Sequence, residues 1–260
     1  MKMLTISIVA YRNYKDIMQA ISSIEKYTSE SIDKYIYIID NSCYDNMDSK
    51  RKEFVDFLSQ WKDVKYIDTK DNLGFGKGHN YILNMVDSQY HAIVNPDILL
   101  IEDSFQKILD YQMREKVGMI IPKLVTEDGE MLKAYRREVT IWDMFIRFCC
   151  PGMFKKRKAF HTMDDADYTK PFDVPFAQGS FLVVETALLK KLNGFDDRFF
   201  MYLEDADLCK RVNGVSQVRY YPDTTVIHKW EKGSHKNMKL LKYHVQSMFS
   251  YFRKWGFKFN

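Results

Sequence analysis

Short apolar segments alternate with longer helical patterns through the first half of this 260-residue chain. The apolar segments, rich in Ile, Val and Tyr, predict strands over Leu4–Tyr11, Tyr35–Asp40, Val64–Asp68, His91–Asn95 and Gly118–Pro122. The segments between them predict helices over Lys15–Tyr27, Lys50–Trp61, Gly78–Asp87 and Ser104–Arg114. Several strands are apolar at almost every position, which is typical of a parallel sheet covered on both faces. The sequence therefore predicts an α/β fold with a mostly parallel, Rossmann-like central sheet flanked by helices.

The second half of the chain has a less regular pattern. It predicts strands over Phe176–Val184, Val218–Tyr220 and Thr225–His228, and helices over Thr186–Leu192, Asp205–Val212 and Met238–Trp255. We find no internal repeat and no linker-like tract. The expectation is one large domain followed by a C-terminal helical extension.

Composition excludes several classes of protein. With 46% hydrophobic and 28% charged residues, the chain is neither disordered nor collagen-like. Its four cysteines form no C-x-x-C pair, which argues against a disulfide framework or a zinc knuckle. No apolar run approaches the roughly 20 residues that cross a bilayer, and the first one lacks a signal-peptide cleavage site. We therefore expect a protein of the reducing cytoplasm.

Polar residues lie at or just beyond the ends of the predicted strands. Tyr11 and Asp40 end the first two strands, Asn72 follows the third, and Asn95-Pro96-Asp97 follows the fourth. In doubly wound sheets, ligands bind at the carboxyl ends of the strands. These residues are therefore the first candidates for a binding site.

The run from Asn72 to Asn80 contains Gly74, Gly76 and Gly78 between a strand and a helix. Glycines let the backbone approach a bulky ligand, and a helix N-terminus offers free N–H groups to an anion. The run lacks the full signature of a dinucleotide-binding loop or a P-loop. The alternative is a tight loop that binds nothing.

Asp97 and His228 are the candidate metal ligands. A carboxylate at a strand end can hold a hard divalent cation, which in turn binds a diphosphate. His228 ends a predicted strand and could complete such a site or contact the diphosphate. The alternatives are an ordinary N-P-D turn at Asp97 and a structural histidine at 228.

The densest acidic cluster runs from Gly194 to Asp207 and contains the adjacent acids Glu204 and Asp205. Aromatic neighbours desolvate a carboxylate, and a second charge beside it raises its proton affinity further, as a general base requires. The alternative is that Asp205 or Asp207 only caps the predicted helix.

Taken together, these motifs resemble those of a known family. They are V-A-Y near the start, I-I-D-N-S, N-L-G-F-G-K-G-H-N, N-P-D, G-F-D-D-R-F-F-M-Y-L-E-D-A-D-L-C-K-R, and a final His. The chain resembles the inverting family 2 glycosyltransferases of GT-A fold, and among them the bacterial rhamnosyltransferases that build surface polysaccharides. The resemblance runs from Leu4 to about Ser234, and the long acidic motif is its most specific part.

The resemblance implies a role for each candidate. The nucleotide-sugar donor, dTDP-L-rhamnose or a UDP-sugar, would be held by Tyr11, Asp40, Asn72, Gly74, Asn80 and Asn95. Asp97, helped by His228, would ligate Mg²⁺ or Mn²⁺ against the diphosphate. Asp205 would be the catalytic base, with Glu204 orienting the acceptor or sharing the role. Asn95 stands where many relatives have a first acid, and Arg12 stands where Asn is frequent.

The resemblance also implies an organisation into regions. A catalytic domain would span residues 1–235, with residues 1–123 binding the nucleotide sugar and 124–235 binding the acceptor. Residues 236–260 would form a basic amphipathic helix. A homodimer is left open by the sequence.

The net charge of +4 is unevenly distributed. Residues 229–260 carry eight basic side chains and one acid, and residues 133–160 carry eight and two, which leaves 23 basic and 32 acidic groups elsewhere. Aromatic residues accompany both basic segments, for example in a short amphipathic helix opening at Thr140. Such segments suit the anionic inner face of the plasma membrane and a polyprenyl-linked glycan acceptor. The alternative is that their apolar stripes pack on the domain.

Other functions fit less well. A sugar-nucleotidyltransferase would need a basic Gly-rich loop near the N-terminus, which we do not find. A nucleic-acid-binding module is opposed by the acidic body of the chain. A non-catalytic nucleotide-sugar-binding protein is the remaining alternative, because Asn95 weakens the metal motif.

Overall fold

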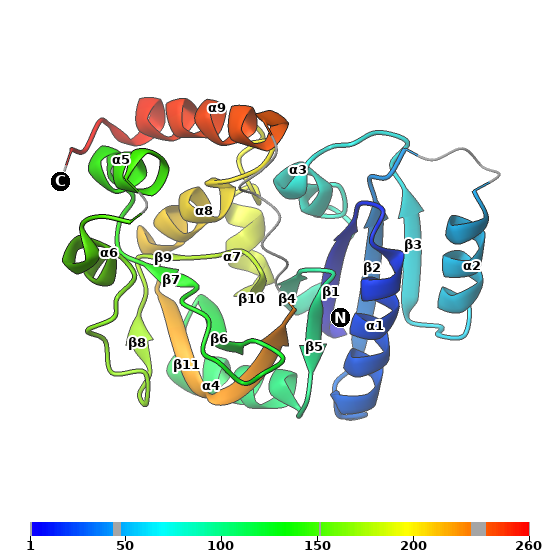
Figure 1. Cartoon of the computed structure of the whole chain (residues 1–260). Helices are drawn as coiled ribbons and strands as arrows, with labels where there is room; N and C mark the ends of the chain where they lie inside the picture. The colour runs from blue at the N-terminus through cyan, green and yellow to red at the C-terminus, as the bar shows by residue number, and fades with distance from the viewer. Residues whose placement is uncertain (1, 44–47, 151, 230–237, 260) are drawn as a thin grey trace.

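The structure is a computed structural model that describes residues 2–43, 48–150, 152–229 and 238–259. One mixed sheet runs through it in the order β3-β2-β1-β4-β10-β6-β11-β5, with β8 paired to β11 (Figure 1). These strands are β1 Lys2–Ala10, β2 Lys34–Asp40, β3 Val64–Asp68, β4 Ser88–Val94, β5 Ile98–Leu100, β6 Met119–Val125, β8 Phe172–Asp173, β10 Phe181–Glu185 and β11 Val218–His228. A separate pair joins β7 Tyr135–Arg136 to β9 Phe176–Ala177.

The sheet is parallel through the pairs that the alternating pattern predicted. β1 pairs in parallel with β2 and β4, and β2 does so with β3. β6 and β11 are also parallel to each other, whereas β10 lies antiparallel between β4 and β6. The α/β class with a mostly parallel sheet is therefore confirmed, with β10, β5 and β8 as the antiparallel members.

Helices cover both faces of the sheet. They are α1 Tyr14–Tyr27, α2 Ser49–Leu58, α3 Phe75–Asn80, α4 Ser104–Glu115, α5 Ile141–Cys149, α6 Lys155–His161, α7 Thr186–Lys191, α8 Glu204–Asn213 and α9 Met238–Trp255. The spacing of Ile17, Ile21 and Ile24 places one stripe of α1 in the core, where all three are fully buried. Asp48, Asp103 and Thr140 begin three of the helices by accepting backbone N–H hydrogen bonds. Thr140 thus confirms the predicted start of α5.

Several boundaries differ from the prediction for physical reasons. The strand predicted over Phe176–Val184 is two strands, β9 and β10. The chain turns between them, where the Gly179 N–H donates to Asp205 (3.1 Å) instead of to a neighbouring strand. The two strands predicted near the end are one, β11, with an irregularity between Tyr221 and Thr225 around a proline that has no N–H to donate. The helix predicted over Gly78–Asp87 begins earlier and ends earlier, as α3.

The C-terminal helix α9 packs on the domain. Tyr251 and Phe252 are buried in a cluster with Leu203 and Ala206 at the start of α8. Figure 1 shows α9 lying across α5 and α8. Of the predicted apolar stripe, Phe252 is buried with Met248 and Trp255 against it, but Leu241 and Val245 are exposed. Within the described residues, the helices include none with the length and apolar character needed to span a bilayer.

Candidate active site

A pocket of about 690 Å³ opens at the carboxyl ends of β1 and β4. Five residues that the sequence singled out lie in its wall: Tyr11, Asn72, Gly74, Asn95 and Asp97. The ends of parallel strands meet at one edge of a sheet, which is why residues 11 to 97 converge here. The opposite wall comes from the far end of the sequence and includes Phe200, Lys239, Leu240 and Tyr243.

Gly74 is fixed by contacts on both sides. Its φ is +78°, and a Cβ built there would lie 2.1 Å from the carbonyl oxygen of Phe200. The Asn72 side-chain oxygen accepts from the Gly74 N–H (3.1 Å), and the Asn41 amide donates to the Gly74 carbonyl (2.8 Å). The next N–H, that of Phe75, donates to Phe200 (3.0 Å). Only glycine satisfies both the backbone angle and the close approach.

Asp40 is buried below the pocket and is absent from its wall. Its Oδ2 accepts from the hydroxyls of Tyr14 and Tyr66, each at 2.6 Å, and Oδ1 accepts from the Ser42 N–H (2.9 Å). Burial and then this carboxylate raise the pKa of the Tyr66 hydroxyl, which keeps it a donor. Asp40 thus orders the strand end, and its neighbour Asn41 reaches the pocket wall.

Asn80 likewise lies outside this wall. Its amide group donates to the Phe195 carbonyl (2.7 Å) and to Asp197 (3.1 Å), while its oxygen accepts from the Phe195 N–H (2.8 Å). Asn80 therefore ties the end of α3 to the loop that leads into the acidic motif. The role predicted for it in the donor pocket stays a prediction.

Asp97 and His228 meet at one edge of the pocket. The His228 Nε2 lies 3.2 Å from Asp97 Oδ2, and the Lys229 N–H donates to the Asp97 carbonyl (3.0 Å). Nearby, Asn95 Oδ1 is buried and has no hydrogen-bond partner within the described ranges. A carboxylate, an imidazole and an unused amide oxygen fit a divalent cation that takes its remaining ligands from a substrate. The described part of the chain holds no cluster of three or more His, Cys, Asp or Glu residues that could bind a metal unaided.

Glu204 and Asp205 form the first turn of α8. Burial, and then the neighbouring Asp205 charge, raise the pKa of Glu204 well above its usual range. Burial also raises the pKa of Asp205, against the opposing effect of the N–H groups of Gly179 and Ala206, which donate to its oxygens at 3.1 and 2.8 Å. Two desolvated carboxyl groups, one of them held in place by backbone donors, have the proton affinity and the orientation that a general base needs.

The acidic pair adjoins the pocket through Gly179. A Cβ built on Gly179 would lie 3.3 Å both from the Asp205 side chain and from the ring of Phe75, which lines the pocket. Similarly, a Cβ on Gly76 would lie 3.7 Å from the Glu204 side chain. The Gly-rich loop therefore separates the pocket from the acidic pair by one aromatic ring.

Asp207 holds the C-terminal helix in place, a role that the sequence did not reveal. It is fully buried and accepts from Trp255 Nε1 (2.8 Å), Arg211 Nε (2.7 Å) and Lys254 Nζ (2.6 Å). Two of these partners belong to α9, so the third acid of the motif fastens the C-terminal helix. The sequence shows an E-D-x-D motif and a basic, aromatic C-terminus, which suggest that the two could interact. Nothing in the sequence specifies which residues pair with Asp207.

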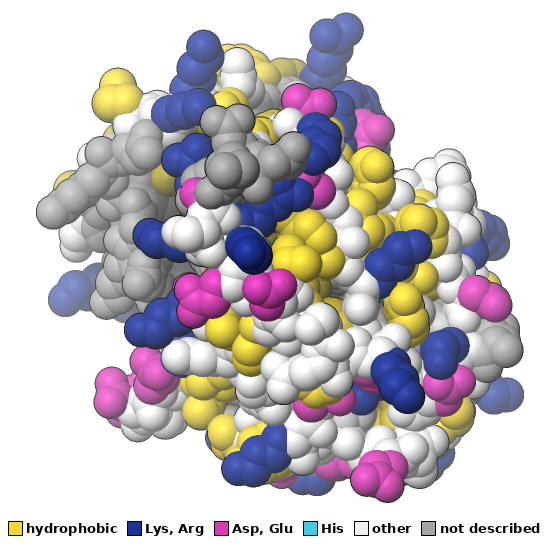
Figure 2. Space-filling model, turned by 90° about the vertical axis from the view of Figure 1, so that its right-hand side faces the viewer, with side chains coloured by type: hydrophobic (Ala, Val, Ile, Leu, Met, Phe, Trp, Pro, Cys, Tyr) yellow, Lys and Arg dark blue, Asp and Glu magenta, His cyan; other side chains and the backbone are white. Residues whose placement is uncertain are grey.

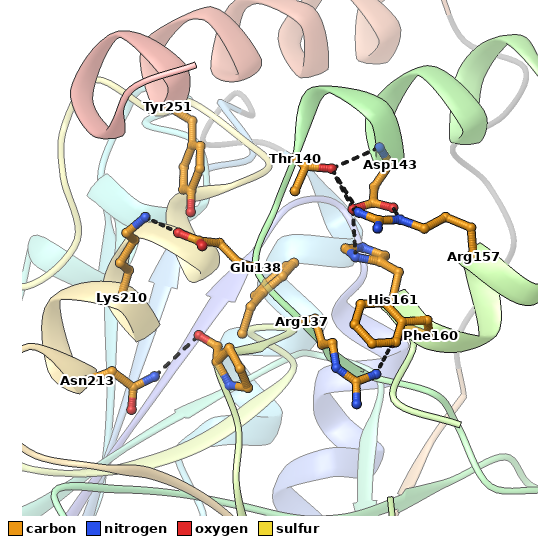
Figure 3. A pocket seen from close by; sticks show the side chains of 12 residues that line it. Arg137, Glu138, Thr140, Asp143, Arg157, Phe160, His161, Lys210, Asn213 and Tyr251 are labelled. Carbon is orange, nitrogen blue, oxygen red and sulfur yellow. Dashed lines mark hydrogen bonds and ion pairs between the residues drawn. The ribbon is translucent and has the colours of Figure 1, made fainter. Parts of the chain in front are cut away.

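A second cavity, of about 650 Å³, lies between α5, α6 and α8 (Figure 3). The carboxylates in its wall are paired. Asp143 binds Arg157, and Glu138 forms ion pairs with Lys210 and Lys258. None of the candidate donor, metal or catalytic residues predicted from the sequence lies in its wall.

The chain resembles known proteins in family, in sequence and in fold. The family model described as "Glycosyl transferase family 2" matches residues 5–192. The chain is 28% identical over 193 residues to the rhamnosyltransferase WbbL of Escherichia coli (strain K12), which covers 68% of this chain and 69% of that protein. It is 25% identical over 189 residues to an N-acetylglucosaminyl-diphospho-decaprenol L-rhamnosyltransferase of Mycobacterium tuberculosis (strain ATCC 25618 / H37Rv), covering 66% of this chain and 60% of that protein.

Two solved structures share the fold at low identity. One is GalNAc-T7 with UDP, GalNAc and Mn²⁺, with a TM-score of 0.67 and 13% identity, covering 98% of this chain and 50% of that chain. The other is the mannosyltransferase PcManGT from Pyrobaculum calidifontis in complex with GDP-Man and Mn²⁺, with a TM-score of 0.67 and 13% identity, covering 97% and 64%. These likenesses confirm the expected GT-A fold. This chain spans half of one neighbour and less than two thirds of the other.

Proposed function

We propose a specific reaction from one premise: this chain belongs to glycosyl transferase family 2. The reaction is the transfer of L-rhamnose from dTDP-L-rhamnose, with inversion, to a lipid-linked glycan acceptor in the synthesis of a cell-surface polysaccharide. The observation that carries it is the placement of the acidic pair one aromatic ring away from a nucleotide-sized pocket. The two sequence relatives, both rhamnosyltransferases, support the choice of sugar.

The donor would occupy the pocket at the strand ends. Tyr11 and Asn72 would contact the base and ribose, and Gly74 would let the nucleotide approach the backbone. Asp40 would act from below by holding the strand end, through Asn41. An exposed Tyr11 ring is suited to stacking on a base.

The diphosphate would lie at Asp97 and His228. Together with Asn95, these residues would hold Mg²⁺ or Mn²⁺, which would supply positive charge opposite the phosphate oxygens. Lys229 is also in the pocket wall, where it adds a cation of the protein's own. It forms ion-pair and hydrogen-bond contacts with Glu127 and Gln19 at the rim.

Asp205 would be the general base. It would accept the proton of an acceptor hydroxyl as that oxygen bonds to the anomeric carbon and the bond from that carbon to the diphosphate breaks. One such displacement inverts the anomeric centre. Glu204, with Oε2 buried and without a partner in the described ranges, would orient the acceptor beside it.

A membrane-bound acceptor requires a membrane-facing surface, and the structure suggests one. Exposed apolar residues occur on two neighbouring helices: Phe145 and Phe148 on α5, and Val245 and Phe249 on α9. Phe148 contacts α9 through the ring of His244 (4.9 Å between centroids). The lysines of α6 adjoin this face in the sequence. We propose that it lies on the anionic inner surface of the plasma membrane.

Vesicle sedimentation tests the membrane proposal. The protein should sediment with vesicles that contain anionic lipid, and Phe249→Glu should reduce the bound fraction severalfold. Binding that is equal on neutral and anionic vesicles, or unchanged in the variant, would contradict it. Analytical ultracentrifugation of the same sample tests for the homodimer.

Binding of nucleic acid is not expected. On the face shown in Figure 2, Lys and Arg side chains are interspersed with Asp and Glu. A basic stripe is the usual feature of a nucleic-acid site, and mixed charge opposes it.

A donor screen tests the reaction most economically. Thermal shifts should be largest with dTDP-L-rhamnose among dTDP-, UDP- and GDP-sugars, measured with Mn²⁺. A shift with UDP-hexoses alone would favour a UDP-hexose donor instead, and a shift with GDP-sugars alone would overturn the donor assignment. Asp97→Asn should abolish the shift if the donor lies where we place it.

A further inference from the structure

The four residues before the acidic pair, called the 200–203 segment below, have an unusual backbone. Tyr202 has a φ of +73° and Leu203 a φ of +64°. Among the described residues, this is the one place where two successive residues other than glycine have positive φ. Bulky side chains avoid this region, and such a conformation persists only where surrounding contacts enforce it. The 200–203 segment therefore requires a support outside itself.

The C-terminal helix α9 contacts the middle of this segment through two side chains. The Ser247 hydroxyl donates a hydrogen bond to the carbonyl oxygen of Met201 (2.8 Å). The His244 ring stacks on the ring of Tyr202, with 4.6 Å between the centroids and 25° between the planes. The hydrogen bond fixes the backbone just before the first residue of positive φ, and the stacked ring fixes the side chain of that residue.

The ends of the segment also contact α9. The Phe200 ring lies 4.4 Å from the ring of Tyr243, measured between centroids. Leu203 belongs to one buried cluster with Tyr251 and Phe252. Each of the four residues therefore contacts α9, which is the support that the strained backbone requires.

Ser247 and His244 are themselves held in place. They are exposed by only 3% and 6%, and the His244 ring has Tyr202 on one side and Phe148 of α5 at 4.9 Å, nearly perpendicular to it. Burial, and then the charge of Arg147, lower the pKa of His244 to about 4, so the ring is neutral at pH 7. Its Nε2 is buried and has no hydrogen-bond partner within the described ranges. His244 therefore acts through the shape of its ring.

The 200–203 segment joins α9 to both parts of the candidate active site. The Leu203 carbonyl accepts from the Asp207 N–H (2.9 Å) in the first turn of α8, the turn that carries the acidic pair. At the other end, the Phe200 carbonyl accepts from the Phe75 N–H (3.0 Å) of the Gly-rich loop. A shift of the segment would therefore move the acidic pair relative to the pocket.

We propose that Ser247 and His244 are positioning residues for the transfer reaction. They hold the 200–203 segment, and through it the acidic pair, in the orientation that removes the proton of the acceptor. Neither residue lies in the pocket wall, so each acts through the segment. The inference rests on the proposed function and adds to it that part of the active-site geometry is set by the C-terminal helix.

Turnover and donor affinity, measured separately, test Ser247. Ser247→Ala should lower kcat for rhamnose transfer by about tenfold, because the backbone before the acidic pair loses a buried hydrogen bond. Affinity for dTDP should stay within about threefold, because Phe200 keeps its hydrogen bond to Phe75 and its contact with Tyr243. Both are measured at a temperature where circular dichroism shows the variant to be folded. An unchanged kcat, or an equal loss of dTDP affinity, would overturn the assignment.

Two substitutions of His244 test whether its ring acts by shape. His244→Phe keeps a ring between Tyr202 and Phe148, so kcat should stay within about threefold of the wild type. His244→Ala removes the ring and should lower kcat by about tenfold, again with dTDP affinity within about threefold. Equal losses in the two variants, or no loss in either, would contradict the role that we assign to the ring.

Ser250→Ala is the matched control. It makes the same change three positions later on α9, at a residue that takes no part in the contacts described above. It should leave kcat and dTDP affinity within about twofold of the wild type. If it lowered kcat as strongly as Ser247→Ala, the effect would belong to the helix as a whole and the assignment would be wrong.

Amide hydrogen exchange, followed by NMR without substrates, separates this inference from the proposed function. The Asp207 N–H is bonded to the Leu203 carbonyl and reports on the segment. Ser247→Ala should speed its exchange by at least about tenfold, and Ser250→Ala by less than about twofold. If this pattern were found in a protein that transferred no rhamnose, the proposed function would fail and the support by α9 would stand. Equal exchange in the wild type and both variants would overturn the inference.

Discussion

In the pocket that we propose for the donor, one wall, called the donor wall below, comes from the ends of neighbouring strands between residues 9 and 97, and backbone contacts fix it. The surroundings of the acidic pair are assembled differently. There, β7, α5, α8 and α9 come together from residues more than 100 positions apart, held by side-chain ion pairs such as those of Asp207. The shape of the donor wall should therefore survive most side-chain changes that spare its turns. The structure around the acidic pair should depend instead on a few buried charges.

The largest effect should come from the charge that fastens the C-terminal helix. Asp207→Asn removes the buried carboxylate that Arg211 binds, while Lys254 keeps its pair with Asp196 (2.7 Å). Breaking a buried ion pair in this way typically costs about 3–5 kcal/mol. Chemical denaturation should show this loss, together with a loss of transfer activity. Asp223→Asn, at an exposed site, should change stability by less than about 0.5 kcal/mol. Similar stability in both variants would mean that α9 is not held in this way.

The next largest effect belongs to the donor wall. Gly74→Ala adds a Cβ at positive φ against the carbonyl of Phe200, and backbone strain of this kind costs about 1–3 kcal/mol. Affinity for dTDP, measured by calorimetry, should fall at least about tenfold. Gly129→Ala has a similar φ of +82° but open space around it, so it isolates the strain. If both variants bound dTDP equally, the close approach at Gly74 would not shape the pocket.

Asn80 distinguishes the two regions directly. Asn80→Ala removes both hydrogen bonds to the Phe195 backbone, which should cost about 1–3 kcal/mol and reduce transfer. Because Asn80 is outside the donor wall, the affinity for dTDP should stay within about twofold. A large loss of dTDP affinity with little change in stability would instead restore the donor role that the sequence predicted.

The smallest effect concerns pH and the buried Glu204. Its pKa is raised in the folded protein, so this group favours the folded state over the unfolded state at low pH. This contribution to the free energy of unfolding is lost as pH rises from 4.5 through the folded pKa. Glutamine does not titrate. Glu204→Gln should therefore melt a few degrees above the wild type at pH 8, and this gap should narrow toward pH 5. A gap that widens toward pH 5 would contradict the raised pKa.

The fold, and the convergence of the strand-end residues on one pocket, could be predicted from the sequence for a physical reason. Periodicity gives the strands, and the carboxyl ends of parallel strands must meet, so Tyr11, Asn72 and Asp97 could be placed together from their positions alone. Asp40 also ends a strand, but its side chain turns to two tyrosines that no local pattern could identify.

The other region could not be predicted in the same way. The β7–β9 pair contains only two residues on each strand, too few for a periodic signal. The partners of Asp207 depend on tertiary contacts across distant segments. The C-terminal helix was predicted as a helix. Its apolar stripe alone does not specify which of its apolar residues pack on the start of α8 and which remain exposed.

The central claim is that Asp205 removes the proton from the acceptor, and turnover of the Asp205→Asn variant tests it. Purified protein is incubated with dTDP-L-rhamnose, a lipid-linked acceptor and Mn²⁺, and the release of dTDP is followed. We expect turnover to fall by about 10²–10⁴-fold while the affinity for dTDP is unchanged. Turnover at the wild-type rate would contradict the assignment of Asp205 as the base.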